Sequence, residues 1–98
     1  MKAILIDDEI DSLETTELLI EKFCPQIVIV GVASDAERGI KIIDKLKPDL
    51  VFLDISMPKM NGFELLKHLK YNKFDLIFTT AYDEYAIQAF QVGAVHYL

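Results

Sequence analysis

The chain has 98 residues, of which 52% are hydrophobic, and its net charge is −6. This length supports one domain with one modest core, and the hydrophobic content excludes a disordered chain. The negative charge argues against direct binding to nucleic acid or to an anionic membrane surface.

Five short runs rich in Ile, Val, Leu and Phe predict β-strands. They span residues 3–6, 27–32, 50–53, 76–80 and 95–98. None of them alternates cleanly between apolar and polar residues, which is typical of strands buried on both faces.

Four helical stretches separate these strands, beginning near residues 11, 34, 63 and 83. The patterns Asp11-x-x-Glu14 and Ser34-x-x-Glu37 predict capping boxes at the first two helices, each of which stops before a proline. Gly93 is a candidate left-handed cap at the end of the fourth helix.

The alternation of strand and helix predicts an α/β fold with right-handed crossovers and a parallel sheet covered on both faces. The length suits the doubly wound, five-stranded, flavodoxin-like order 2-1-3-4-5. Residues 1–98 show no linker, repeat or low-complexity segment, so they form one predicted domain.

Acidic residues follow two of the predicted strands at the points where these strands end. Asp7 and Asp8 follow the first strand, and Asp54 follows the third. Because strands 1 and 3 are neighbours in this order, the three carboxylates should converge where ligands bind such sheets. Oxygen ligands of this kind suit Mg²⁺, and also Mn²⁺.

The fourth predicted strand ends at Thr80, whose hydroxyl would reach the same edge of the sheet. Each of these side chains alone has an ordinary explanation, such as a charge at a helix N-terminus or a solvated loop acid. The combination favours phosphoryl transfer onto Asp54, with the metal neutralising charge during in-line attack.

Three other functions fit the same fold. An aspartyl-phosphate phosphatase usually has a second acid two residues after the nucleophile, and here that position is Ser56. A flavodoxin-like cofactor binder would need a phosphate-binding loop after strand 1, where this chain has acids. A pure interaction module with vestigial acids is the third alternative.

The stretches LIDDE, VFLDISMPKMNGFELL and IFTTAY resemble the CheY-like receiver domain of response regulators in two-component signalling, and the resemblance covers essentially the whole chain. It implies a phospho-acceptor switch that is no enzyme in the ordinary sense, although it promotes its own phosphorylation and dephosphorylation. Asp54 would be the acceptor, and Asp8 and Asp54 would bind Mg²⁺. Asp7 would help mostly through water, and the backbone carbonyl of Ser56 would be a further ligand.

The same resemblance implies that Thr80 is the switch hydroxyl and Tyr97 the switch aromatic. The phosphoryl donor would be a sensor histidine kinase. The stretch FTTAYDEYAIQAFQVGAVHYL is similar to receivers coupled to LytTR-type DNA-binding domains, which implies an output domain outside these 98 residues.

In similar proteins the fifth strand continues into a Lys-Pro pair and a fifth helix, whereas this sequence stops at Leu98. A chain truncated there is expected to leave one sheet face covered by the first helix alone. We therefore expect self-association through that face and the edge formed by strands 4 and 5.

The N-terminal sequence MKAILIDDEI is not typical of a signal peptide, because its apolar run is short and acids follow at once. No stretch approaches the roughly 18 apolar residues of a membrane span. The single cysteine, Cys24, fits a reducing compartment. These features predict a soluble, cytoplasmic protein.

Overall fold

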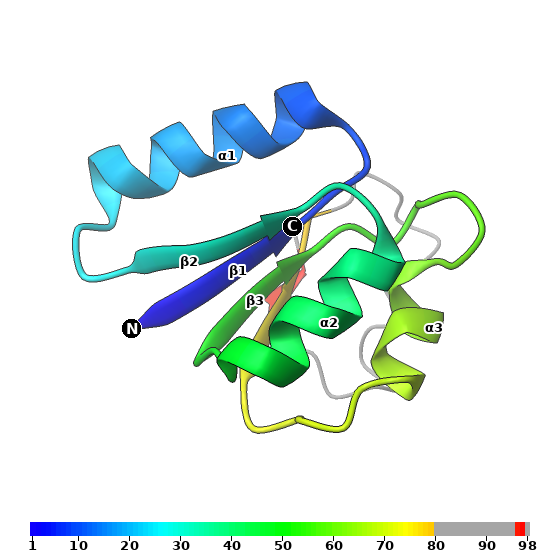
Figure 1. Cartoon of the computed structure of the whole chain (residues 1–98). Coiled ribbons are helices and arrows are strands. Elements are labelled where there is room, and N and C mark those ends of the chain that lie inside the picture. Colours follow the sequence, from blue (N-terminus) through cyan, green and yellow to red (C-terminus); the bar gives the residue numbers. More distant parts are fainter. Residues whose placement is uncertain (80–95, 98) are drawn as a thin grey trace.

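The computed structural model describes residues 1–79 together with the backbone of residues 96–97 (Figure 1). The elements, in chain order, are β1 (Lys2–Ile6), α1 (Ile10–Phe23), β2 (Val28–Ala33), α2 (Ala36–Leu46), β3 (Leu50–Leu53), α3 (Gly62–Lys67), β4 (Asp75–Phe78) and β5 (His96–Tyr97). The predicted helix that begins near residue 83 lies outside the described residues.

The strands form one parallel sheet in the order β2-β1-β3-β4-β5, which confirms the predicted topology. Val51 of β3 lies opposite Ile4 of β1 on one side and opposite Leu76 of β4 on the other. Every residue of β3 is buried, as its continuous apolar sequence predicts for a strand covered on both faces.

The helices lie on both faces of the sheet (Figure 1). On one face, α1 packs through Leu13 and Ile20 onto Leu5 of β1. On the other face, α2 and α3 share a larger apolar cluster with the sheet. Within the described part of the chain, no helix is both long enough and apolar enough to cross a membrane.

Both predicted capping boxes are wrong in position. The first helix begins at Ile10, before Asp11, because the N–H of Glu9 donates to the carboxylate of Asp7 and turns the chain into the helix at once. The second helix is capped by Asp35 instead of Ser34, and the Asp35 carboxylate accepts a hydrogen bond from the N–H of Arg38 at 2.7 Å.

A capping box does exist at the start of α3, where the sequence patterns above did not place one. The side chain of Asn61 accepts a hydrogen bond from the N–H of Glu64, and the side chain of Glu64 accepts one from the N–H of Asn61. This pair fixes the point at which the loop after β3 becomes helical.

Candidate functional site

Three carboxylates meet at the carboxyl edge of the sheet. Asp7 and Asp8 follow β1, Asp54 follows β3, and one oxygen from each lies within 4.8 Å of the other two. In the described part of the chain this is the one group of three or more side chains arranged to hold a metal ion. The predicted convergence of these residues is therefore confirmed.

The sheet ladder continues past the strand ends and holds the backbone of the site. The N–H of Asp7 donates to the last carbonyl of β2 at 3.1 Å, and the N–H of Asp54 donates to the last carbonyl of β1 at 2.9 Å. The N–H of Thr79 donates in the same way to β3 at 2.9 Å. The site residues thus stand on the rigid sheet instead of on free loops.

Backbone donors also orient two of the three carboxyl groups. The N–H of Glu9 donates to Oδ1 of Asp7 at 3.0 Å, and the N–H of Ser56 donates to Oδ1 of Asp54 at 3.2 Å. Each of these two carboxyl groups therefore has one oxygen fixed by the loop that follows it, and the remaining oxygens interact within the acidic cluster.

Asp54 is the most buried acid of the three, with 9% of its surface exposed. Burial raises the pKa of its carboxyl group from 3.8 to about 7, and the negative charge of Asp7 adds to this rise. A hydrogen bond with the carboxyl group of Asp8 acts in the same direction, whereas the N–H of Ser56 opposes it. Without a cation, the site therefore holds a proton near neutral pH.

The pKa of the Asp7 carboxyl group is raised as well, and the largest cause is again burial. Burial raises the pKa of its carboxyl group, while hydrogen bonds from the N–H of Glu9 and with the side chain of Asp54 counteract part of that rise. The charges of Asp8 and Glu9 add smaller upward effects. A cation between these groups would replace the repulsion among them with attraction.

The geometry fits Mg²⁺. Oxygen ligands lie about 2.1 Å from Mg²⁺, so two ligands on opposite sides of the ion are about 4.2 Å apart. Carboxylate oxygens within 4.8 Å of one another need only small side-chain movements, or one bridging water, to reach that spacing. Asp7, Asp8 and Asp54 are the residues that would hold the ion.

The loop after Asp54 approaches it closely through Gly62. A Cβ atom on Gly62 would lie 2.8 Å from the backbone carbonyl oxygen of Asp54 and 3.0 Å from Cα of Ile55. Within this loop, Lys59 has a positive φ of 68°, which is uncommon for a residue with a side chain. The sequence contains this glycine, but only the fold shows what it contacts.

The remaining predicted site residues are placed only in part. Ser56 adjoins Asp54 and is exposed, and its backbone carbonyl stays a predicted ligand. Thr80 lies outside the described residues. The backbone of Tyr97 pairs with Phe78 of β4, which puts it at the same edge of the sheet as the site.

Thr79, which precedes Thr80, was not predicted as a site residue. It lines a hollow of about 300 Å³ beside the acidic cluster, together with Asp7, Asp11, Ser12, Thr15 and Thr16. Four of these six side chains carry hydroxyl groups, so a polar recess adjoins the carboxylates.

Comparisons with known proteins agree with this geometry. A family model described as the response regulator receiver domain matches residues 3–98. An uncharacterised response regulatory protein of Vibrio cholerae is 49% identical over 100 aligned positions, which cover all of this chain and 41% of that protein. The transcriptional regulatory protein BtsR of Escherichia coli K12 is 39% identical and is covered to the same extent, 41%.

Solved structures show the same fold. The response regulatory domain of mrkE from Klebsiella pneumoniae superposes with a TM-score of 0.89 at 31% identity, covering all of this chain and 81% of that one. The chain spans about two fifths of the length of the curated relatives, which also include the sensory transduction protein LytT of Bacillus anthracis at 39% identity. This chain therefore belongs to the response regulator receiver domain family, and its relatives are of the LytT and BtsR type.

Proposed function

We propose that this chain is a phospho-acceptor switch that takes a phosphoryl group onto Asp54 from a phosphohistidine of a sensor histidine kinase. The observation that carries the proposal is the convergence of Asp7, Asp8 and Asp54, with the most buried of them in reach of both others. In the transfer, an oxygen of the ionised Asp54 carboxylate forms the new bond to phosphorus and the bond from phosphorus to the histidine nitrogen breaks. With a proton already on its other ring nitrogen, the donor leaves as neutral imidazole.

Each residue of the cluster has a distinct part in this reaction. Asp54 is the nucleophile, and the N–H of Ser56 holds one of its oxygens so that the other faces the donor. Asp8 and Asp54 would hold Mg²⁺, or Mn²⁺ in its place, together with the backbone carbonyl of Ser56, and Asp7 would help mostly through water. The ion, when bound, neutralises the charge that builds up on the phosphoryl oxygens.

Thr80 and Tyr97 complete the proposed switch. The hydroxyl of Thr80 would donate a hydrogen bond to the phosphoryl group, and Tyr97 would respond by changing its rotamer. The pairing of Tyr97 with β4 at the edge next to the site supports this assignment. The hydrogen bond exists only after phosphorylation, so it can shift the equilibrium between two states.

The names of the relatives support a wider proposal. Since one relative is called a transcriptional regulatory protein, we propose that this receiver works in the cytoplasm and controls a DNA-binding output domain. The receiver itself would make no direct contact with DNA or with a membrane. Self-association through the sheet face that α1 covers and the edge formed by β4 and β5 is part of the same proposal.

The test is to incubate the chain with Mg²⁺ and a small acyl phosphate and to separate the products on a Phos-tag gel. Asp54→Asn should abolish the shifted band, because the amide has nearly the same shape and cannot attack phosphorus. Asp49→Asn, at the opposite edge of the sheet, is the matched control and should be labelled like wild type. Label that persists in Asp54→Asn would refute the proposed acceptor.

A further inference from the structure

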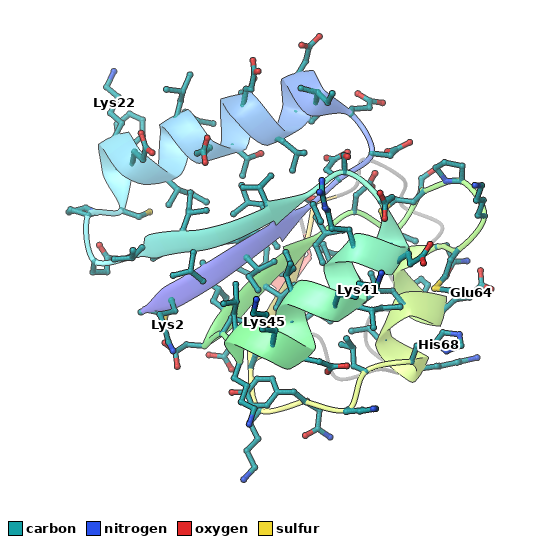
Figure 2. The ribbon with its side chains drawn as sticks, viewed as in Figure 1. Lys2, Lys22, Lys41, Lys45, Glu64 and His68 are labelled. Carbon is teal, nitrogen blue, oxygen red and sulfur yellow. The ribbon has the colours of Figure 1, made fainter. Side chains whose placement is uncertain are left out.

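The loop that joins Asp54 to α3 is held at its far end by the capping box of α3. Asn61 and Glu64 exchange two hydrogen bonds, with the Asn61 side chain accepting at 2.9 Å and the Glu64 side chain accepting at 3.2 Å. Glu64 is exposed and lies on the outer side of α3, so by position alone it is an ordinary solvated acid (Figure 2).

Gly62, the first residue of the helix, transmits this anchoring to the acceptor. Its N–H donates to the carbonyl oxygen of Ile55 at 2.9 Å, and that same oxygen also accepts from the N–H of Met57 at 3.0 Å. A Cβ on Gly62 would stand 2.8 Å from the carbonyl oxygen of Asp54. The start of α3 is therefore packed directly on the peptide group that follows the acceptor.

The helix itself is fixed to the core next to this contact. Phe63 is 5% exposed, and its ring lies 5.1 Å from the ring of Phe78 in β4, while Leu65 is fully buried. These anchors set the position of α3, and the capping box sets the point at which the loop meets it. The peptide of Ile55 and Ser56 between the two fixed ends then has little freedom.

That peptide carries the group that orients the acceptor, because the N–H of Ser56 donates to Oδ1 of Asp54. We propose that Asn61 and Glu64 are positioning residues for phosphoryl transfer, acting through Gly62 and Ile55 on the carboxyl group of Asp54. This role rests on the proposed function for its chemistry. The orientation of the Asp54 carboxyl group also governs how it would bind a metal ion, independently of phosphoryl transfer.

The test compares alanine variants with variants that keep the hydrogen bonds. Asn61→Ala and Glu64→Ala should each slow phosphorylation by roughly tenfold, since a misplacement of about 1 Å can cost about a hundredfold. Glu64→Gln and Asn61→Ser should restore the rate, because these side chains retain the acceptor that a capping box needs. The affinity for Mn²⁺, measured by electron paramagnetic resonance, should weaken and recover in the same variants.

Tyr71→Phe is the control for general destabilisation. The Tyr71 hydroxyl lies 2.9 Å from the carbonyl oxygen of Lys73 and 3.2 Å from that of Pro48, near the opposite edge of the sheet. Removing this hydroxyl costs one hydrogen bond, as each alanine variant does, without touching the loop between Asp54 and α3. Tyr71→Phe should leave the phosphorylation rate and the Mn²⁺ affinity as in wild type.

Two results would overturn the positioning role. One is alanine variants that lose no more rate or Mn²⁺ affinity than Tyr71→Phe does. The other is a Glu64→Gln variant as impaired as Glu64→Ala, since the charge of Glu64 would then matter instead of its hydrogen bond. If wild type takes no label at all, the proposed function fails, and the Mn²⁺ affinities still decide whether the capping box positions Asp54.

Discussion

Acidic residues lie at both ends of the strands in this sheet. Those at the carboxyl ends come together in one cluster, whereas those at the amino ends do not. At the carboxyl edge, Asp7, Asp8 and Asp54 bring oxygens within 4.8 Å of one another. At the amino edge, Asp49 precedes β3 and Asp75 is the first residue of β4, and both are exposed. One Asp49 oxygen is already occupied by the N–H of the first residue of β1 at 2.8 Å.

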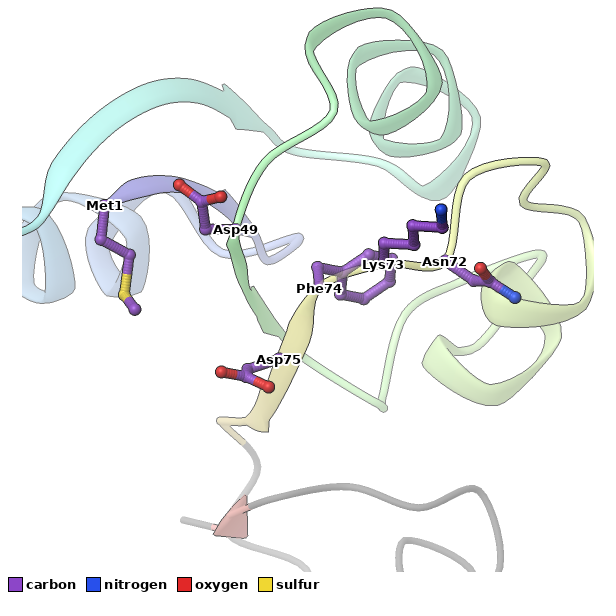
Figure 3. A pocket seen from close by; sticks show the side chains of 6 residues that line it. All are labelled: Met1, Asp49, Asn72, Lys73, Phe74 and Asp75. Atoms are coloured by element: carbon purple, nitrogen blue, oxygen red, sulfur yellow. The ribbon is translucent and has the colours of Figure 1, made fainter.

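The amino edge has the larger hollow, about 540 Å³ against about 300 Å³ beside the acidic cluster. Figure 3 shows its lining, which is Met1, Asp49, Asn72, Lys73, Phe74 and Asp75. A lysine and the N-terminal residue are among these, so this lining combines positive with negative charge. Neither hollow size nor the number of acids therefore locates the site. The site is instead located by the convergence and burial of like charges, because a cation or a proton must compensate these charges.

Metal binding should show the largest difference between the two edges. Saturating Mg²⁺, at about 100 times its dissociation constant, should stabilise the fold by about 2.7 kcal/mol and raise Tm by roughly 10–20 °C. Asp8→Ala should lose most of this gain because it removes one of the three ligands. Thermal melts with EDTA and with Mg²⁺ measure the effect.

Asp75→Ala is the matched variant at the amino edge, and its Mg²⁺-dependent gain should equal that of wild type. An equal gain in Asp8→Ala and Asp75→Ala would mean that Mg²⁺ binds somewhere other than the acidic cluster.

The close approach at Gly62 should give the next largest effect. Gly62→Ala should lower the free energy of unfolding by about 2 kcal/mol, because the new Cβ meets backbone atoms of Asp54 and Ile55 that cannot move freely. In Gly39→Ala the Cβ would lie 2.7 Å from Cδ1 and 3.3 Å from Cγ1 and Cγ2 of Ile6, which are side-chain atoms and not backbone. There the clash is largely offset by the helix propensity of alanine, about 1 kcal/mol.

Urea unfolding of both variants, in the absence of metal, makes the comparison. A loss in Gly39→Ala as large as that in Gly62→Ala would show that the backbone contact with Asp54 is not special.

Stability should depend on pH through Asp54. Its folded pKa, about 7, lies above the unfolded value of 3.8, so the folded state binds the extra proton between these values. The resulting stabilisation is complete below pH 3.8 and is lost as pH rises through about 7. The metal-free chain should thus lose up to about 1.4 kcal/mol per pH unit within that window through this group.

Urea melts in EDTA from pH 5 to pH 8 measure this slope, with Asp54→Asn as the reference that cannot titrate. Mg²⁺ should reduce the slope, since it favours the ionised carboxylates. Identical slopes in wild type and Asp54→Asn would rule out the raised pKa.

The smallest expected effect lies near the amino edge. Tyr71→Phe should lower the free energy of unfolding by about 1 kcal/mol. The substitution removes the hydroxyl and with it the hydrogen bond to the loop before β4. The affinity for Mg²⁺ should stay unchanged, as measured by isothermal titration calorimetry. Weaker Mg²⁺ binding in Tyr71→Phe would mean that the two edges of the sheet are coupled.

Much of the fold follows from local patterns. The continuous apolar sequence of β3 predicts a strand buried on both faces, and the alternation of strands and helices predicts a parallel sheet. The topological rule for ligand sites in such sheets then predicts that Asp7, Asp8 and Asp54 lie together.

Helix starts were less predictable, because several residues compete to cap each one. Glu9 and Asp35 stand at the N-caps of α1 and α2, instead of the predicted Asp11 and Ser34. Which residue becomes the N-cap depends on where the chain leaves the preceding strand. At α1 this is decided by the turn that Asp7 makes with Glu9.

The sequence by itself determined which acids meet at the carboxyl ends of the strands, because it places Asp7 and Asp8 directly after β1 and Asp54 directly after the neighbouring β3. Only the tertiary structure decided how these acids behave. Burial, more than neighbouring charge, raises the pKa of Asp54, and burial depends on what packs above it. The contact between Gly62 and the backbone of Asp54 joins residues eight positions apart across a loop. Its tightness depends on how the anchored α3 meets β3, which no local pattern encodes.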